Sequence, residues 1–194
     1  MKVLIGGHKQ RGKDCLEAVL RKGHDVVGVL AHPGVIPSES GGELVAEALR
    51  RKVPLFQPTD VNDPDVLATL QKFSPDLIVL SGYSQIVRAE FLQLAPKGCW
   101  NLHGGKLPEY RGSSPMNWAL INGDQEITLS LVQVSQGVDT GEILVERSFP
   151  VGTDETITQV QERAYSLFPE MITEALDRLD AGTLEPRHQD ESRA

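Results

Sequence analysis

MKVLIGGHKQRGKDCLEAVLRKGHDVVGVL, residues 1–30, decides the fold. An apolar strand over Lys2–Ile5 closes in two glycines, a helix over Asp14–Lys22 stops at Gly23, and a second apolar strand covers Asp25–Leu30. Strands that are apolar throughout, with a helix between them, are typical of a parallel sheet that is covered on both faces.

The same alternation continues downstream, after a loop rich in proline, glycine and serine. Strands that alternate with helices predict an α/β fold, here a Rossmann-like, mostly parallel sheet with helices on both faces. In such sheets ligands bind beyond the carboxyl ends of the strands. The segments are the loop His32–Gly42, helices over Leu44–Arg51 and Asp63–Phe73, and strands over Val53–Phe56 and Asp76–Leu80.

Beyond Thr128 the pattern changes from continuous to alternating apolar residues. ITLSLVQV (residues 127–134) and EILVERSFPV (residues 142–151) predict an antiparallel strand pair near the C-terminal part of the chain, joined by a loop that carries Asp139.

A long amphipathic helix is expected over Thr156–Asp180, with an interruption near Pro169 and a stop at Gly182. The length of 194 residues fits one domain with a full hydrophobic core. We therefore expect one domain over residues 1–182 and a C-terminal tail over residues 183–194.

Composition bounds the class of protein. The net charge of −8 gives no basic footprint for nucleic acid in total charge. No apolar run approaches the roughly 20 residues of a membrane span, and the start is too quickly polar for a secretory signal. Cys15 and Cys99 lie far apart without metal-type spacing and suggest a reducing compartment, so we expect a cytoplasmic protein without a membrane partner.

The glycine cluster GGHKQRGK (residues 6–13) has neither the GxGxxG nor the GxxxxGK[ST] spacing, which argues against a dinucleotide-binding dehydrogenase. Its basic residues Lys9, Arg11 and Lys13 form a basic loop near a helix N-terminus, which could receive a phosphate. Solvated surface charge explains them nearly as well.

The central run WNLHGGKLPEYRGSSPMNWALINGD begins at Trp100 and carries the polar residues of most interest. Asn101 and His103 are two apart at a strand end, so both side chains point to the same side. Asp139 lies further on, between Gly137 and Gly141, in what looks like a tight turn that aims a carboxylate. Each residue alone is more often structural than catalytic.

Taken together, these motifs resemble the catalytic domain of the folate-dependent formyltransferases, and the similarity covers nearly the whole chain. That family includes enzymes acting on methionyl-tRNA, on glycinamide ribonucleotide and on amino sugars. The matching motifs are Asn101 and His103, Leu107-Pro108, Tyr110-Arg111-Gly112 and Asp139-Thr140-Gly141.

The resemblance implies an enzyme that transfers a formyl group to a primary amine through three catalytic residues. Attack on the formyl carbon creates an oxyanion, to which the Asn101 amide and a His103 N–H can donate hydrogen bonds. Asp139 can take the amine proton directly or through a water. This chemistry requires no metal, and the sequence shows no metal-ligand cluster.

The resemblance further implies 10-formyltetrahydrofolate as the co-substrate, held largely by backbone groups of two loops. Without the resemblance, the apolar pair Ile86-Val87 would equally suggest core packing. By position, the folate-binding candidates are Gln85, Ile86 and Val87, followed by Gln136, Gly137 and Val138.

The acceptor amine is predicted from departures from the family pattern. Lys106 replaces a leucine beside the catalytic histidine and could meet a phosphate or carboxylate, or could simply be solvated. The run GGKLPEYRGSSPMNW is most similar to the enzymes that formylate nucleotide-linked amino sugars. Substrate-binding candidates are Lys106, Lys9, Arg11 and Tyr83, the last at a strand's carboxyl end.

Alternative acceptors and roles stay open at this point. They are the catalytic domain of a methionyl-tRNA formyltransferase, a glycinamide ribonucleotide formyltransferase and a non-catalytic folate-binding module. The ending PRHQDESRA resembles a run that continues into further segments in the tRNA and sugar enzymes, so we expect an excised or a naturally minimal domain. We predict that the acceptor is a small-molecule amine. A nucleic-acid partner is expected only if the acceptor is a tRNA, and the sequence leaves open whether the protein forms a homodimer.

Overall fold

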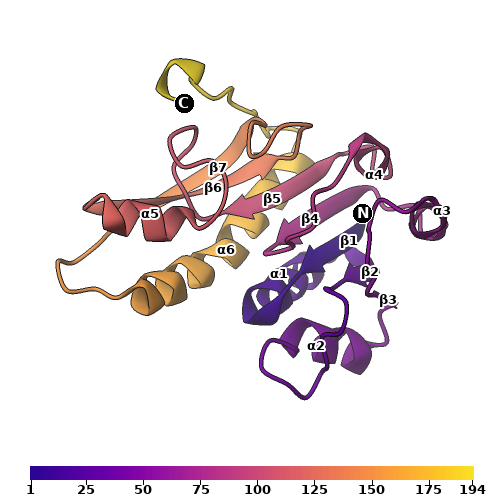
Figure 1. Ribbon diagram of the computed structural model, residues 1–194. Helices are drawn as coiled ribbons and strands as arrows, with labels where there is room; N and C mark the ends of the chain where they lie inside the picture. Colours follow the sequence, from indigo (N-terminus) through magenta and orange to yellow (C-terminus); the bar gives the residue numbers. More distant parts are fainter. The chain divides into compact units, whose positions relative to one another are not determined.

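The computed structural model describes all 194 residues, which divide into two compact units, Met1–Trp100 and Asn101–Ala194. The strands of the first unit follow the order β3-β2-β1-β4, and the remaining strands follow the order β5-β6-β7 (Figure 1). The predicted fold class, a Rossmann-like, mostly parallel sheet with an antiparallel pair near the C-terminal part, is confirmed. None of the helices combines the length and apolarity that crossing a bilayer requires.

In the first unit, parallel β1 lies between β2 and β4, and β2 also pairs with β3. The central strands β1 and β4 are buried along nearly their whole length, and α1 packs against β1 and α2. The elements are β1 Lys2–Gly7, α1 Lys9–Arg21, β2 Asp25–Leu30, α2 Glu43–Arg51, β3 Leu55–Phe56, α3 Pro64–Gln71, β4 Leu77–Ser81 and α4 Ala89–Leu92.

Helix α1 begins at Lys9, five residues before the predicted start at Asp14, so that prediction was wrong at its boundary. Gly12 lies in the first turns, where a side chain would have to stand 2.9 Å from Leu44 and 3.3 Å from the backbone of Gly7. Glycine has a low helix propensity, and the residues around it are basic rather than apolar. The sequence therefore shows no helical periodicity before Asp14, although the glycine is needed for this close approach. The short α4 was not predicted, because four residues carry no periodicity.

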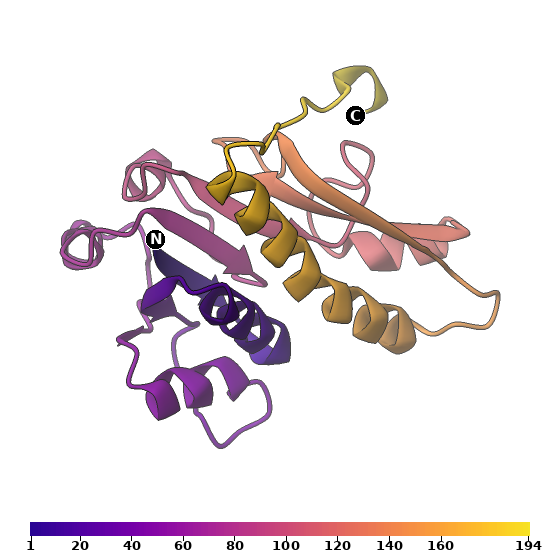
Figure 2. The same cartoon turned by 180° about the vertical axis from the view of Figure 1, so that it is seen from behind.

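In the second unit, β6 and β7 pair antiparallel, as predicted, and α6 packs on both strands (Figure 2). The elements are β5 Cys99–His103, which starts just before the unit boundary, α5 Pro115–Ile121, β6 Glu126–Gln133, β7 Ile143–Pro150, α6 Ile157–Asp180 and a final 3-10 turn, η1 Glu191–Arg193.

Helix α6 continues through Pro169, so the predicted interruption is wrong. A proline inside a helix costs about 3 kcal/mol because it lacks an amide hydrogen and crowds the preceding turn. Here buried side chains on both sides of the proline, including Ala164, Phe168 and Met171, anchor one continuous face. A capping box at Thr156 additionally fixes the start of the helix.

Candidate active site

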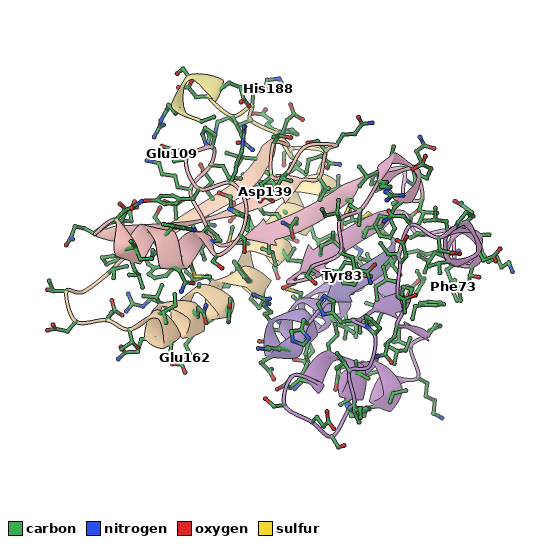
Figure 3. The ribbon with its side chains drawn as sticks, in the orientation of Figure 1. Phe73, Tyr83, Glu109, Asp139, Glu162 and His188 are labelled. Atoms are coloured by element: carbon green, nitrogen blue, oxygen red, sulfur yellow. The ribbon has the colours of Figure 1, made fainter.

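Strand β5 and the turn between β6 and β7 bring the three predicted catalytic residues together within the second unit. Asp139, labelled in Figure 3, lies in the turn. Its Oδ2 lies 3.4 Å from His103 Nδ1, and its Oδ1 lies 3.5 Å from Asn101 Nδ2. The alternation of β5 explains why Asn101 and His103 reach the same carboxylate.

The Asp139 turn is held in a conformation that few residues adopt. Asp139 has a φ of +51°, in the left-handed region, and its Oδ2 accepts a 3.0 Å hydrogen bond from the Gly112 amide. A Cβ on Gly141 would lie 1.6 Å from the Gln133 carbonyl oxygen, and one on Gly137 would lie 2.4 Å from Thr140 Oγ1. The flanking glycines are therefore needed for close packing rather than for a special φ.

His103 is buried, with 5% of its surface exposed, and both ring nitrogens have a partner. Nε2 lies 2.6 Å from the Tyr110 carbonyl oxygen. Because a carbonyl only accepts, Nε2 carries a hydrogen, and Nδ1 is the nitrogen that faces Asp139. A neutral His103 thus presents an Nδ1 lone pair to the site, and a protonated His103 donates to the carboxylate.

The loop between β5 and α5 is fixed from several sides. The Tyr110 amide donates to the Lys106 carbonyl at 2.8 Å, and the Tyr110 hydroxyl donates to Asp124 Oδ2 at 2.6 Å. Buried Ser130 donates from Oγ to the Gly105 carbonyl oxygen at 2.9 Å. A cavity of about 280 Å³ borders this loop, lined in part by Gly104, Gly105, Lys106 and Tyr110.

Two residues that the sequence reasoning gave no role lie against the same site. Gln189 is 9% exposed, and its Nε2 donates to the carbonyl oxygens of Asp139 and Gly141 at 2.7 Å each. Its Oε1 accepts from Arg111, a residue known so far only as part of a motif. The ending PRHQDESRA contained the signal, but a sequence alone does not show what its glutamine touches.

The predicted folate-binding residues lie in both units. In the first unit the Gln85 side chain is engaged structurally, accepting from the Val61 amide at 2.8 Å and donating to the Pro58 carbonyl at 2.9 Å. Ile86 is 77% exposed, which rules out core packing for it. In the second unit Gln136, Gly137 and Val138 are all exposed beside Asp139.

Of the predicted substrate-binding residues, Tyr83 follows the carboxyl end of β4. It is buried and stacks on His32 with ring centroids 5.3 Å apart. Burial, and secondarily Asp60, raises the pKa of Tyr83 to about 12. His32 Nε2 accepts from the Ser84 amide at 3.0 Å, and burial, together with Arg11, lowers the pKa of His32.

The basic candidates differ from expectation. Lys9 and Arg11 belong to the first turn of α1, so the predicted basic loop is wrong. The Arg11 guanidinium lies so close to Gly82 that a Cβ there would be 2.1 Å from Arg11 Nε. Lys106 is half exposed and lies 3.5 Å from Glu109, which offsets part of its charge.

The fold and the site together define an α/β protein with a Rossmann-like sheet, in which an amide, an imidazole and a carboxylate meet at one turn. A family model described as formyl transferase matches residues 2–176. The chain belongs to the formyl transferase family, which confirms the resemblance seen in the sequence.

Relatives extend this finding. The chain is 37% identical over 182 residues to the methionyl-tRNA formyltransferase of Geobacter metallireducens, which covers 91% of this chain and 58% of that protein. It is also 37% identical over 184 residues to the methionyl-tRNA formyltransferase of Anaeromyxobacter dehalogenans, covering 92% and 59%. The chain thus spans about three fifths of the length of these relatives.

Solved structures share the fold. An N-formyltransferase from Helicobacter canadensis, in complex with folinic acid and dTDP-3-aminofucose, superposes with a TM-score of 0.82 at 18% identity, covering 100% of this chain and 69% of that one. Glycinamide ribonucleotide transformylase 1 from Symbiobacterium toebii gives a TM-score of 0.79 at 24% identity, covering 97% and 93%.

Proposed function

We propose that this protein transfers a formyl group from 10-formyltetrahydrofolate to a primary amine, with Asn101, His103 and Asp139 as the catalytic residues. The observation that carries the proposal is the Asp139 carboxylate, which lies 3.4 Å from His103 Nδ1 and 3.5 Å from Asn101 Nδ2. Family membership supports the reaction type.

Asn101 stabilises the oxyanion that develops when the amine attacks the formyl carbon. His103 adds a second donor only from a protonated Nδ1, because its Nε2 already donates to the Tyr110 carbonyl oxygen. The Asn101 amide has two hydrogens, and only one is directed at Asp139, so the second is available to the oxygen. A fixed donor in a partly buried site needs no reorganisation during the reaction, and one such donor is commonly worth about 3–4 kcal/mol of the barrier.

Asp139 accepts the proton that the attacking nitrogen releases as the new N–C bond forms. When the tetrahedral centre collapses, the donor's N–C bond breaks, and the leaving nitrogen takes up a proton from the site. His103 can pass this proton on, since its Nδ1 faces Asp139 while Nε2 stays bound to Tyr110. Protons and electron pairs therefore balance without a covalent enzyme intermediate.

We propose that residues of two loops, Gln85–Val87 and Gln136–Val138, bind the co-substrate. Each loop leaves one large apolar side chain exposed, Ile86 in the first unit and Val138 in the second, and each offers an apolar contact to a ligand. Because the Gln85 side chain is engaged with Val61 and Pro58, this loop has backbone groups to offer rather than the Gln85 amide.

For the acceptor, we propose the α-amine of methionyl-tRNA ahead of a nucleotide-linked amino sugar. Methionyl-tRNA formyltransferases match at 30–37% identity over at least 91% of this chain, whereas the N-formyltransferase in complex with a nucleotide-linked sugar matches at 18%. The sequence argument for a sugar nucleotide rested on the similarity of the run GGKLPEYRGSSPMNW and on Lys106, whose charge Glu109 partly offsets. The amino sugar remains the second candidate because Lys106 is still half exposed beside the site.

The test is an incubation of the purified protein with 10-formyltetrahydrofolate and one acceptor at a time. The acceptors are charged initiator tRNA, a nucleotide-linked amino sugar and glycinamide ribonucleotide, with the formylated product read by mass spectrometry. Formyl-methionyl-tRNA as the preferred product supports the first candidate, and a formylated sugar supports the second. Folate binding without product from any acceptor would favour a non-catalytic folate-binding module and overturn the proposal.

A further inference from the structure

The segment after α6 returns to the catalytic turn in a defined register. Arg187 and Ile143 form an antiparallel bridge, each donating its amide to the other's carbonyl oxygen at 2.8 Å. Moving two residues along each chain sets Gln189 opposite Gly141, next to Asp139. His188, labelled in Figure 3, points outward between them and is exposed.

The Gln189 amide uses its complete hydrogen-bonding capacity at this place. Nε2 donates to the carbonyl oxygens of Asp139 and Gly141, both at 2.7 Å. Oε1 accepts from Arg111 Nη2 at 2.8 Å and from Arg111 Nε at 3.0 Å. Two donors and two acceptor sites are all that an amide has, and the partners fix which end is nitrogen.

Arg111 joins this amide to the other half of the site. Its chain neighbours are Tyr110, whose carbonyl accepts from His103 Nε2, and Gly112, whose amide donates to Asp139 Oδ2. The guanidinium is held from its outer side by Glu191, at 2.5 and 3.0 Å. The loop that orients His103 and the turn that carries Asp139 are therefore tied together by the Arg111–Gln189 pair as well as by the Gly112–Asp139 hydrogen bond.

We infer that Gln189 and Arg111 are positioning residues that set the distance between the Asp139 carboxylate and the His103 imidazole. Neither side chain contacts either reacting group itself; each acts through backbone groups of the turn and the loop. This inference rests on the proposed function, because it assigns these residues to the same reaction. The buried amide also explains why an uncharged glutamine, able both to donate and to accept, stands at this position.

Positioning residues matter here because the rate of the reaction is sensitive to small displacements of the catalytic groups. A misplacement of about 1 Å at a reacting centre can cost roughly 100-fold in rate. Replacing Gln189 leaves the carbonyl oxygens of Asp139 and Gly141 without their donor and leaves the Arg111 guanidinium with Glu191 alone. A buried polar group without a partner drives local rearrangement. The Gly112–Asp139 hydrogen bond is then left to hold the turn to the loop, and the distance between Asp139 and His103 is fixed less tightly.

The experiment compares Gln189→Met, Gln189→Glu, Arg111→Met and the double variant Gln189→Met/Arg111→Met. Methionine keeps the volume of glutamine without its hydrogen bonds, whereas glutamate can still pair with Arg111 but cannot donate to the turn. Arg193→Ala is the matched control, since Arg193 lies in the same segment but pairs with Glu109 on the surface. Measurements are kcat, KM for the folate donor, melting temperature and ¹⁵N spectra of the His103 ring.

Each single variant is expected to lower kcat on the order of 10- to 100-fold, with KM for the donor within about twofold. The double variant should be no worse than the poorer single one, because the pair acts as a unit. The His103 ring signals should shift while those of His24, which lies in the first unit, stay. Unchanged kcat in folded Gln189 variants, additive losses, or a loss shared by Arg193→Ala would overturn the inference.

The ring spectra do not depend on turnover. If wild-type protein forms no product, the proposed function fails, but a His103 signal that shifts in Gln189→Glu still supports the positioning role. If wild-type protein is active and the His103 signals stay fixed in both Gln189 variants, the positioning role fails while the function stands.

Discussion

The backbone amide of Gly112 donates a 3.0 Å hydrogen bond to Oδ2 of Asp139, across 27 positions of sequence. The same oxygen lies 3.4 Å from His103 Nδ1, so one carboxylate oxygen meets a fixed backbone donor and a titratable ring. The bond from Gly112 keeps the carboxylate in place whether or not His103 is protonated. Asp139 is therefore oriented before any substrate arrives.

Asp139→Asn should lower turnover by roughly 10²- to 10⁴-fold, the usual contribution of a positioned general base. The asparagine oxygen can still accept from Gly112, so the turn and the melting temperature should change little, while the group that takes the amine proton is lost. Steady-state kinetics with the accepted amine measure the effect. Asp154→Asn, at an exposed position, is the control. Full turnover in folded Asp139→Asn would remove Asp139 from the mechanism.

Asn101→Ala should lower kcat by roughly 10²- to 10³-fold, as removal of one oxyanion donor does elsewhere. Asn101 is only partly buried and its contact with Asp139 is long, at 3.5 Å, so its loss should cost little stability. Because the donor acts on charge that develops during the reaction, KM should stay nearly constant. A variant with raised KM and unchanged kcat would instead assign Asn101 to substrate binding.

The fold was predictable because local patterns and topology agree in most places. The continuously apolar β1 and β4 and the alternating β6 and β7 are read directly from their residues. Failures occurred where a contact outweighs the local signal: Gly12 sits inside α1 because it packs on Gly7, and Pro169 is tolerated in α6 because buried neighbours hold the helix.

The candidate site was predictable as far as its motifs reach. Asn101, His103 and Asp139 stand out by spacing, and they meet in the structure. Gln189 could not be found in this way, since its role depends on the bridge between Arg187 and Ile143, which no local pattern encodes. A residue that acts through backbone contacts leaves no chemical signature in a single sequence.

Gly141→Ala should destabilise the protein by about 1–3 kcal/mol and reduce activity, because overpacking forces the backbone to shift. Its Cβ would lie 1.6 Å from the Gln133 carbonyl oxygen, which cannot be relieved by a side-chain rotation. The displaced strand end would carry Asp139 away from His103. Gly152→Ala is the control, since no atom lies closer than 3.6 Å to a Cβ there. Urea unfolding and kcat should both remain at wild-type values in that control.

Glu47→Gln should destabilise the protein at neutral pH and hardly at all near pH 2.5. Hydrogen bonds from Arg50 foremost, opposed by burial and aided by Arg51, lower the pKa of Glu47 to about 2. An unfolded glutamate has a pKa of about 4.3, so its charged form contributes stability above that pH, and the contribution is lost as the pH falls toward about 2. Since Arg50 is exposed to water, the gain at pH 7 should be only about 0.5–1 kcal/mol.

Urea unfolding of wild type and Glu47→Gln at pH 7 and pH 2.5 measures this difference, with exposed Glu162→Gln as the control. The gap between wild type and Glu47→Gln should narrow at the acidic pH because unfolded glutamate is then protonated and folded Glu47, near its pKa of about 2, is losing its charge. An equal gap at both pH values would mean that Glu47 contributes through packing and neutral hydrogen bonds, and that its carboxylate is not held in the charged form by Arg50 and Arg51. If the gap widened toward acid, the pKa of Glu47 would be raised in the folded protein, which is the opposite of the expected direction.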